Sequence, residues 1–142
     1  MAERQASELV AVYVVGSKAS VGFCRVGPEA DFDGLQYLAS LPSGDQKKFE
    51  ARFVRLAELG SLVNAEHFNY EGSGIWFLKI DGHRLACFKH TGRWLMITSG
   101  AKKDPKDRTR RQTVARAVRI RDQFLFALAA ERANSKEVQH DD

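Results

Sequence analysis

The sequence predicts an α+β fold in which a small, mainly antiparallel sheet packs against N-terminal helices and a long C-terminal helix. Three observations support this prediction. The dipeptide Asp81-Gly82 separates two apolar runs, a strong signal for a tight β-hairpin. Apolar residues follow a helical period over about residues 44–59 and again over residues 107–133. The chain has 142 residues, close to the commonest domain size, so we expect residues 1–142 to form a single domain.

The N-terminal elements are expected in the order strand, strand, helix. Residues 9–15 (LVAVYVV) are rich in β-branched and aromatic side chains, which favour a strand. Residues 21–26 (VGFCRV) predict a second strand after a short turn. Proline suits the first turn of a helix, so a short helix is expected from Pro28 to about Ser40.

The next predicted element is the helix over about residues 44–59. Ser43 is a favourable N-cap, and Gln46, three residues later, completes the pattern of a capping box. Gly60 is a natural residue to end this helix because glycine adopts a positive φ without strain. Residues 61–74 are expected to be a connection.

The C-terminal half predicts a hairpin, a second hairpin and a helix. Thr91-Gly92 separates the second apolar run from a third. A three-stranded antiparallel meander is therefore expected over residues 75–80, 83–90 and 93–99. The helix over residues 107–133 then closes the fold, and the polar tail 134–142 is expected to fray.

Composition argues against a membrane protein and against a disulfide-stabilised one. The longest apolar run, Leu9–Val15, is far shorter than the roughly 20 residues that span a bilayer. Glu3 and Glu8 stand where a signal peptide would be basic. Cys24 and Cys87 fit neither a disulfide framework nor a zinc-site spacing. We therefore expect a cytoplasmic protein without a membrane partner, a metal or another cofactor.

The positive charge is concentrated in one part of the chain. The net charge is +4, but residues 79–121 carry 13 basic and 3 acidic side chains. The flanking segments 1–78 and 122–142 each carry a net charge of −3. Such asymmetry indicates an anionic partner, most often a nucleic acid, although a solvated basic surface is the plainer alternative.

The register of the two predicted hairpins places basic residues in a row. A two-residue turn sets Lys79 opposite Arg84, and the second hairpin sets Arg84 opposite Ser99. The row would lie at one end of an apolar sheet face, which is made by Ile75, Phe77, Ala86, Phe88, Leu95 and Ile97. Like charges on opposed residues destabilise a sheet, so an anion such as phosphate, or an acid such as Asp81, is expected to offset them. Alternatively, these long side chains extend into water.

Further basic residues follow the last predicted strand. Lys102 and Lys103 leave this strand near the row, and Lys106 and Arg108 come next. Lysine and arginine contacts to phosphates confer affinity without sequence readout. These residues are therefore candidates for binding RNA phosphates.

The order of these segments resembles the RelE/ParE toxin superfamily, in particular its phage-derived HigB-like branch. The resemblance covers about residues 41–128 and is carried by GIWFLK (74–79), HRLACFKH (83–90), WLMITSGAKKDPKD (94–107) and the closing helix. Within these segments, the basic positions of that branch match Lys79, Arg84 and the pair Lys102-Lys103, which is followed by Pro105.

The resemblance implies a RelE-like fold and the toxin of a type II toxin–antitoxin pair. Such a toxin enters the ribosome, cleaves mRNA without a metal and is bound by a helix-turn-helix antitoxin. Cleavage needs a cationic clamp on the phosphate, for which Arg84 is the first candidate. Lys79, Lys102 and Lys103 would share phosphate binding and charge stabilisation, with Ser99 as a hydroxyl donor.

Proton transfer requires a further residue. His83 and His90 are the candidates, because histidine titrates near neutral pH. Alternation places His90 on the Arg84 face at the other end of the strand, and His83 on the opposite face. We take His90 with Arg84 and Lys79 as the candidate catalytic set.

Two other functions remain open. Many nucleases of the superfamily have a catalytic Tyr or His near the C-terminus, where this chain has only His140 in a polar segment. Its absence would suit a ParE-like toxin that binds a protein such as gyrase. It would also suit an inactive phage accessory protein that binds RNA or a partner.

Overall fold

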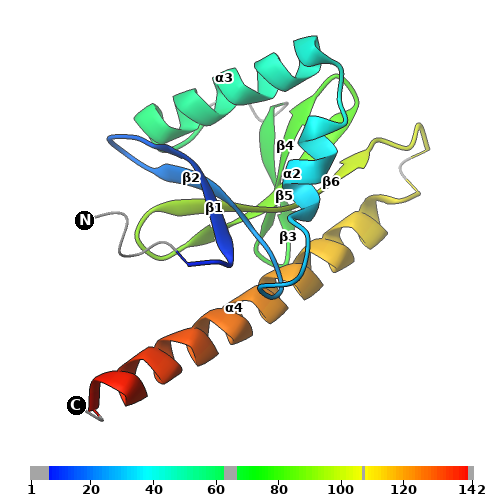
Figure 1. Cartoon of the computed structure of the whole chain (residues 1–142). Helices are drawn as coiled ribbons and strands as arrows, with labels where there is room; N and C mark the ends of the chain where they lie inside the picture. The colour runs from blue at the N-terminus through cyan, green and yellow to red at the C-terminus, as the bar shows by residue number, and fades with distance from the viewer. Residues whose placement is uncertain (1–6, 63–66, 107, 141–142) are drawn as a thin grey trace.

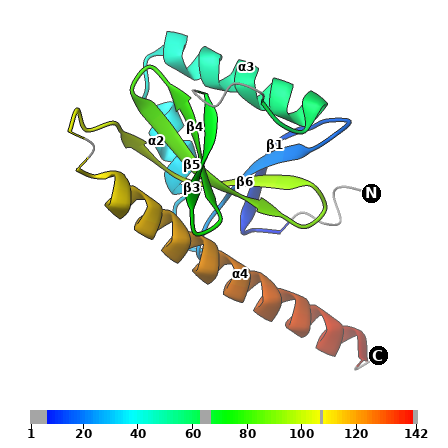
Figure 2. The same cartoon turned by 180° about the vertical axis from the view of Figure 1, so that it is seen from behind.

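The sheet lies between two helical layers (Figure 1). In the computed structural model, residues 7–62, 67–106 and 108–140 are described. The helices α2 (Asp33–Ala39) and α3 (Ser43–Leu59) cover one face of the sheet, and α4 (Arg110–His140) crosses the other face. The view from behind shows α4 running diagonally along the sheet with its C-terminal end beyond the strands (Figure 2).

The sheet has six strands in the order β1-β2-β6-β5-β4-β3. Their bounds are Val10–Val15 (β1), Ser20–Cys24 (β2), Phe68–Gly72 (β3), Ile75–Ile80 (β4), His83–His90 (β5) and Trp94–Lys102 (β6). The strands β2 and β6 are parallel, and every other neighbouring pair is antiparallel. The prediction of an α+β protein with a mainly antiparallel sheet and a long C-terminal helix is confirmed.

Apolar side chains form one core on each face of the sheet. Phe49 and Phe53 of α3 are fully buried against the sheet at the spacing of one helical turn. On the other face, Ile120 and Phe124 of α4 pack against a cluster that includes Phe77 of β4. Each fully buried side chain of this size contributes about 1.5–3 kcal/mol to folding. The two cores therefore hold the helical layers to the sheet.

The helices differ from the prediction at their ends. The first helix, α2, is shorter than expected and begins at Asp33. Pro42, not Ser43, is the N-cap of α3, and the Gln46 amide donates instead to the carbonyl oxygens of Ala39 and Leu41. The capping-box prediction is therefore wrong, although Gly60 ends the helix with φ 83° as expected.

The last helix is displaced relative to the prediction. Its expected start, Asp107, lies outside the described residues, and α4 begins at Arg110. The tail was expected to fray from residue 134, but the helix continues to His140. Within the described ranges, no helix combines the length and the apolar character needed to cross a membrane.

The strand β3 was missed, because residues 61–74 were expected to be a connection. It pairs with β4, so the expected three-stranded meander has four strands, β3 to β6. Gly72, Ser73 and Gly74 all have positive φ, and Ser73 and Gly74 form the turn between β3 and β4. The alternation of Phe68 and Tyr70 before this glycine-rich turn was the signal for a hairpin.

The second hairpin has a longer loop than predicted, and its register is different. His90 pairs with Trp94 rather than Arg93, so three residues form the loop. Between Ala86 and Cys87 the register shifts again, leaving Thr98 as an extra residue whose hydroxyl donates to the carbonyl oxygen of Ala86. The strand β6 therefore presents different residues to each face of the sheet than the sequence predicted.

The two register changes reassign the third strand of the predicted apolar face. Leu95 and Ile97 belong to the core under α2 and α3, and Met96 takes the place beside α4. At the far end of the strand, Arg84 pairs with Ala101 instead of Ser99. The first hairpin, in contrast, has the predicted register, including Lys79 opposite Arg84.

Candidate functional site

A hollow lined with basic side chains lies at the end of the sheet where β4 turns into β5. Its volume is about 560 Å³. The lining residues come from α3, the β4–β5 hairpin, the residue before β3 and the loop after β6: Lys48, Arg52, His67, Lys79, Ile80, Asp81, Gly82, His83, Arg84 and Lys103. Five of these are cations and one is a carboxylate. The hollow is therefore a positively charged surface shaped to receive an anion.

The β4–β5 turn brings Lys79 and Arg84 together. Asp81 and Gly82 both have positive φ, as a two-residue turn of this kind requires, and this turn fixes the pairing of the two cations. The Arg84 guanidinium lies 5.5 Å from the centroid of the Phe77 ring, which restrains one side of the group. Lys79 and Arg84 thus extend from the edge of the α4-side core.

The neighbouring helix α3 adds two further cations. Lys48 Nζ lies 2.7 Å from a carboxylate oxygen of Asp81, and this hydrogen bond and charge lower the pKa of Asp81. Arg52 donates to the carbonyl oxygen of Lys79 over 3.3 Å. Burial lowers the pKa of Arg52, although a guanidinium remains charged at neutral pH. Because Asp81 is paired with Lys48, positive charge dominates the hollow.

The predicted lysine pair is divided between the hollow and its margin. Lys103 lines the hollow, and its backbone N–H donates to the carbonyl oxygen of Gly82 over 2.6 Å. Lys102 pairs in register with His83 and is exposed, but it is not among the lining residues. The bond from Lys103 therefore fastens the end of β6 to the β4–β5 turn.

The structure does not bring Ser99, Lys106 or Arg108 into this site. Ser99 is 1% exposed, and its hydroxyl lies 3.3 Å from that of Thr98, so the prediction of Ser99 beside Arg84 is wrong. Asp104 accepts a hydrogen bond from the backbone N–H of Lys106 and from that of Arg108, and the Arg108 side chain pairs with it at 2.9 Å. Lys106 and Arg108 are exposed in the loop before α4.

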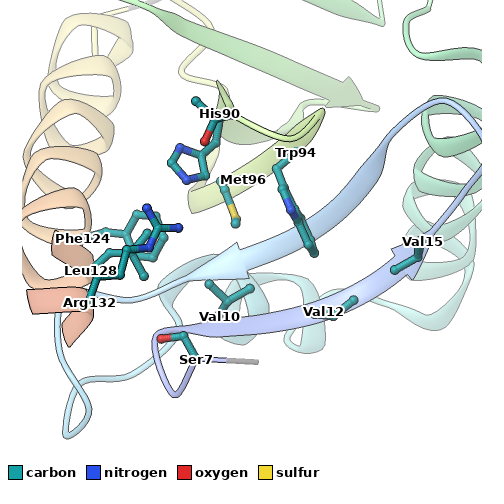
Figure 3. Close-up of a pocket in the computed structure, with 11 residues that line it drawn as sticks. Ser7, Val10, Val12, Val15, His90, Trp94, Met96, Phe124, Leu128 and Arg132 are labelled. Atoms are coloured by element: carbon teal, nitrogen blue, oxygen red, sulfur yellow. The ribbon is translucent and has the colours of Figure 1, made fainter. Parts of the chain in front are cut away.

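His90 also lies apart from the hollow. It occupies the opposite end of β5, six residues from Arg84, which corresponds to about 20 Å along a strand. There it faces a separate pocket between the sheet and α4, and its ring lies 6.1 Å from that of Phe124 (Figure 3). The structure therefore does not support the grouping of His90 with Arg84 and Lys79.

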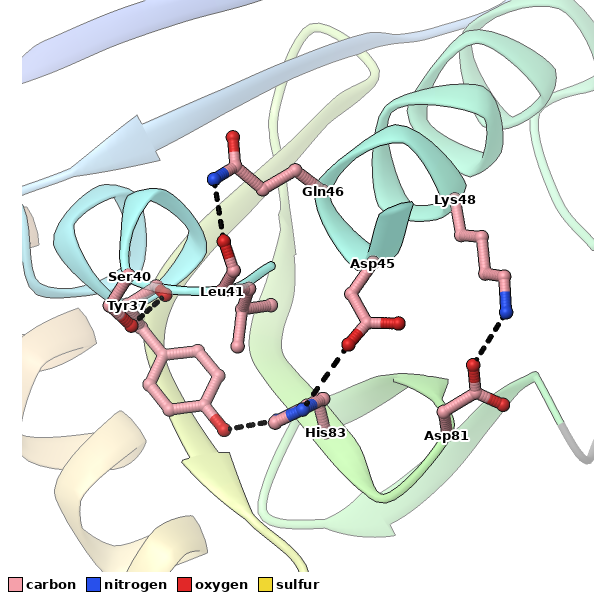
Figure 4. Close-up of polar contacts among 8 residues, drawn as sticks. All are labelled: Tyr37, Ser40, Leu41, Asp45, Gln46, Lys48, Asp81 and His83. Carbon is pink, nitrogen blue, oxygen red and sulfur yellow. Dashed lines mark hydrogen bonds and ion pairs between the residues drawn. The ribbon is translucent and has the colours of Figure 1, made fainter. Parts of the chain in front are cut away.

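Of the two histidines, His83 reaches the hollow. It does so from the face covered by α2 and α3, whereas Arg84 lies over Phe77 on the α4 face, so the hollow extends around the end of the sheet. His83 Nδ1 lies 2.7 Å from the Tyr37 hydroxyl, and its Nε2 lies 3.7 Å from a carboxylate oxygen of Asp45 (Figure 4). A carboxylate only accepts, so the Nε2–H tautomer satisfies both neighbours and Tyr37 donates to Nδ1. Burial raises the pKa of Tyr37, which keeps this phenol protonated.

The residues that sequence reasoning missed come from α2 and α3. Tyr37, Asp45, Lys48 and Arg52 lie far along the chain from the basic segment, and only the fold brings them to the β4–β5 turn. In the described part of the chain, no three His, Cys, Asp or Glu side chains gather closely enough to hold a metal ion. Comparison of the chain with family models, curated proteins and solved structures finds no match.

Proposed function

We propose that this protein is a toxin of the RelE/ParE kind that binds mRNA on the ribosome and cleaves it. The main support is the convergence of Lys79, Arg84 and Lys103 with two cations of α3 around one hollow at the end of the sheet. A phosphodiester backbone carries the opposite charge. An open hollow lined by cations from several elements suits such an extended substrate.

Arg84 and Lys79 have the chemistry required to stabilise a phosphate that gains charge during cleavage. In the proposed step, the RNA 2′-oxygen bonds to phosphorus while the bond from phosphorus to the 5′-oxygen breaks. The guanidinium fork of Arg84 matches two phosphate oxygens, and Lys79 adds a second positive charge beside it. The products are a 2′,3′-cyclic phosphate and a 5′-hydroxyl, and the step uses no cofactor.

His83 is proposed as the proton donor in place of His90. The hydroxyl of Tyr37 holds its ring at the hollow, with the carboxylate of Asp45 facing the other ring nitrogen. The distance of 3.7 Å to Asp45 is too long for a firm hydrogen bond, so the proton on Nε2 is not committed to Asp45. In its protonated form, with Nδ1–H now donating to the Tyr37 oxygen, His83 would donate the Nε2 proton to the departing 5′-oxygen, while the 2′-hydroxyl proton passes to water.

The proposed partners are the ribosome with its mRNA, and a helix-turn-helix antitoxin. A toxin of this class needs a protein surface for neutralisation as well as an RNA surface. Phe126 of α4 is 79% exposed, an unusual position for a phenylalanine in a polar helix. This helix face is distinct from the basic hollow and could hold the antitoxin without competing for RNA.

The decisive experiment is to add purified protein to a translating extract and map the new 5′ ends of the mRNA. We expect codon-phased cuts from the natural sequence and their loss in Arg84→Gln and Lys79→Gln. Arg119→Gln, which changes an exposed arginine outside the hollow, is the matched control and should cut normally. Cutting by Arg84→Gln at the natural rate would overturn the assignment of the site.

The same assay separates the two alternatives. Uncut mRNA together with inhibition of gyrase supercoiling would favour a ParE-like toxin. Uncut mRNA together with salt-sensitive RNA binding would favour an RNA-binding accessory protein. The basic hollow favours the RNA-directed functions, because a cation-lined site matches phosphate rather than an apolar protein surface.

A further inference from the structure

A second pocket lies on the α4 side of the sheet, at the end opposite the basic hollow. It has a volume of about 220 Å³ and is bounded by β1, the β5–β6 loop, β6 and α4 (Figure 3). Its size is below the roughly 300–1,000 Å³ of pockets for drug-sized ligands, so it fits a small molecule. Val12 and Val15 of β1, 50% and 63% exposed, line the pocket on the side away from α4.

The walls of this pocket are apolar. Val10 and Val12 of β1 form one side, and Phe124 and Leu128 of α4 form the other. Met96 lies between Phe124 and the indole ring of Trp94, which stands over β1. Val12 is 50% exposed, although a β-branched apolar side chain on a sheet face is ordinarily covered. The walls therefore offer apolar surface to the body of a ligand.

Arg132 and His90 add a cation and an imidazole to this apolar space. The guanidinium of Arg132 in α4 points toward His90 at the end of β5 (Figure 3). Burial, followed by the positive charge of Arg132, lowers the pKa of His90. The two groups thus repel one another when both are charged, and an anion between them would remove this repulsion.

The other charged groups around His90 do not supply that anion. Lys89 and Arg93 line an adjacent hollow on the same loop and are both cations. Glu131, next to Arg132, does not line the pocket itself; its carboxylate accepts a hydrogen bond over 3.0 Å from the hydroxyl of Ser7, which does, so this acid is already paired beside the pocket. Among its lining residues the pocket therefore combines apolar walls with one permanent cation, Arg132.

We propose that this pocket binds a small carboxylic acid with an apolar body, such as a medium-chain fatty acid or an aromatic acid. The carboxylate lies between Arg132 and His90, and the hydrocarbon packs against Trp94, Phe124 and Leu128. A charge-assisted hydrogen bond from Arg132 fixes the orientation of the ligand. The site is separate from the basic hollow and does not depend on the proposed RNA cleavage.

Nuclear magnetic resonance of the full chain tests this proposal with octanoate as the probe and 1-octanol as its neutral counterpart. We expect octanoate to shift the His90 imidazole resonances saturably and to raise the pKa of His90. Octanol should bind about tenfold more weakly, since it lacks the charge-assisted bond. Equal binding of the two probes would contradict the role of the carboxylate, and no saturable shift at millimolar octanoate would contradict the site.

Arg132→Gln should weaken octanoate binding by about tenfold and leave octanol binding unchanged. Arg132 is exposed at its helical position, so the variant is expected to fold. Arg119→Gln removes the same charge from the same helix outside the pocket and should bind both probes normally. Unchanged octanoate binding by Arg132→Gln would show that another group holds the anion and would overturn the proposal.

Discussion

The Tyr37 hydroxyl lies 2.7 Å from Nδ1 of His83 and so joins α2 to the first residue of β5. The two rings meet edge to face, with centroids 5.8 Å apart. Tyr37 also packs over Gly100 of β6, where the absence of a side chain makes room for the phenol. A residue of a short helix thus positions the histidine at the basic hollow.

Replacing Tyr37 by phenylalanine should cost about 1 kcal/mol of unfolding free energy, because Nδ1 of His83 loses its partner while the ring packing remains. Urea denaturation measures this change. Tyr13→Phe is the control, since Tyr13 is 38% exposed and packs through its ring against Phe53. An equal loss in both variants would show that the Tyr37–His83 bond contributes nothing particular to stability.

Gly100→Ala should destabilise the protein by about 1–3 kcal/mol, because the added methyl group would overlap the ring of Tyr37. Gly27→Ala adds the same methyl group in open space and should change stability by less than about 0.5 kcal/mol. Thermal or urea unfolding compares the two. If the clash with Tyr37 is the cause, the cost of Gly100→Ala should largely disappear when Tyr37 is also replaced by glycine, which removes every Tyr37 atom that the methyl group would meet.

Phe124→Ala should cost about 3–5 kcal/mol, because this fully buried ring fills the core between α4 and the sheet. Phe126→Ala removes the same ring two residues further along, where it is 79% exposed. It should change stability by less than about 0.5 kcal/mol. Similar losses in the two variants would contradict the placement of α4 on the sheet.

The elements that sequence analysis predicted correctly depend on local signals. The stripe of Phe49 and Phe53 and the terminal Gly60 predicted α3, and Asp81-Gly82 predicted the first hairpin with its register. Lys79 and Arg84 were therefore placed opposite one another correctly. The Asp81-Gly82 turn alone was therefore enough to predict that these two cations lie at the same end of the sheet.

The errors arise where a distant contact overrides a local pattern. The three-residue loop before Trp94 and the extra residue Thr98 set the register of β6, a strand that also pairs with the distant β2 on its other side. They moved Ser99 into the core. The surroundings of the two histidines likewise depend on distant helices, because α2 contacts His83 and α4 contacts His90. No local sequence pattern specifies where these helices lie on the sheet.

The stability of the protein should fall as the pH decreases from about 7 to 5, in part because of His90. Burial and the charge of Arg132 lower its pKa below the usual 6.5. Below pH 6.5, His90 takes up a proton in the unfolded chain before it does so in the folded chain. The contribution of His90 to stability is therefore complete above pH 6.5 and is lost as the pH falls through the pKa of His90 in the folded state. Urea unfolding at several pH values measures the slope.

His90→Asn is expected to make this slope shallower. The pKa values of Asp81 and Asp104 are also lowered, by Lys48 and by Arg108 respectively. These carboxyl groups contribute stability that is present above about pH 3.8 and lost at lower pH, outside the window of His90. An unchanged slope between pH 5 and 7 in His90→Asn would refute the assignment of this pH dependence to His90.

Arg84→Gln should weaken the binding of single-stranded RNA and also reduce its salt dependence. Each phosphate contact contributes about 0.7 to the slope of log affinity against log salt for a single strand, because binding releases a counterion. We expect the slope to fall by about this amount in Arg84→Gln and to stay unchanged in Arg119→Gln. Fluorescence anisotropy of a labelled oligonucleotide across a salt series measures both. Weaker binding with an unchanged slope would mean that Arg84 shapes the hollow without contacting a phosphate.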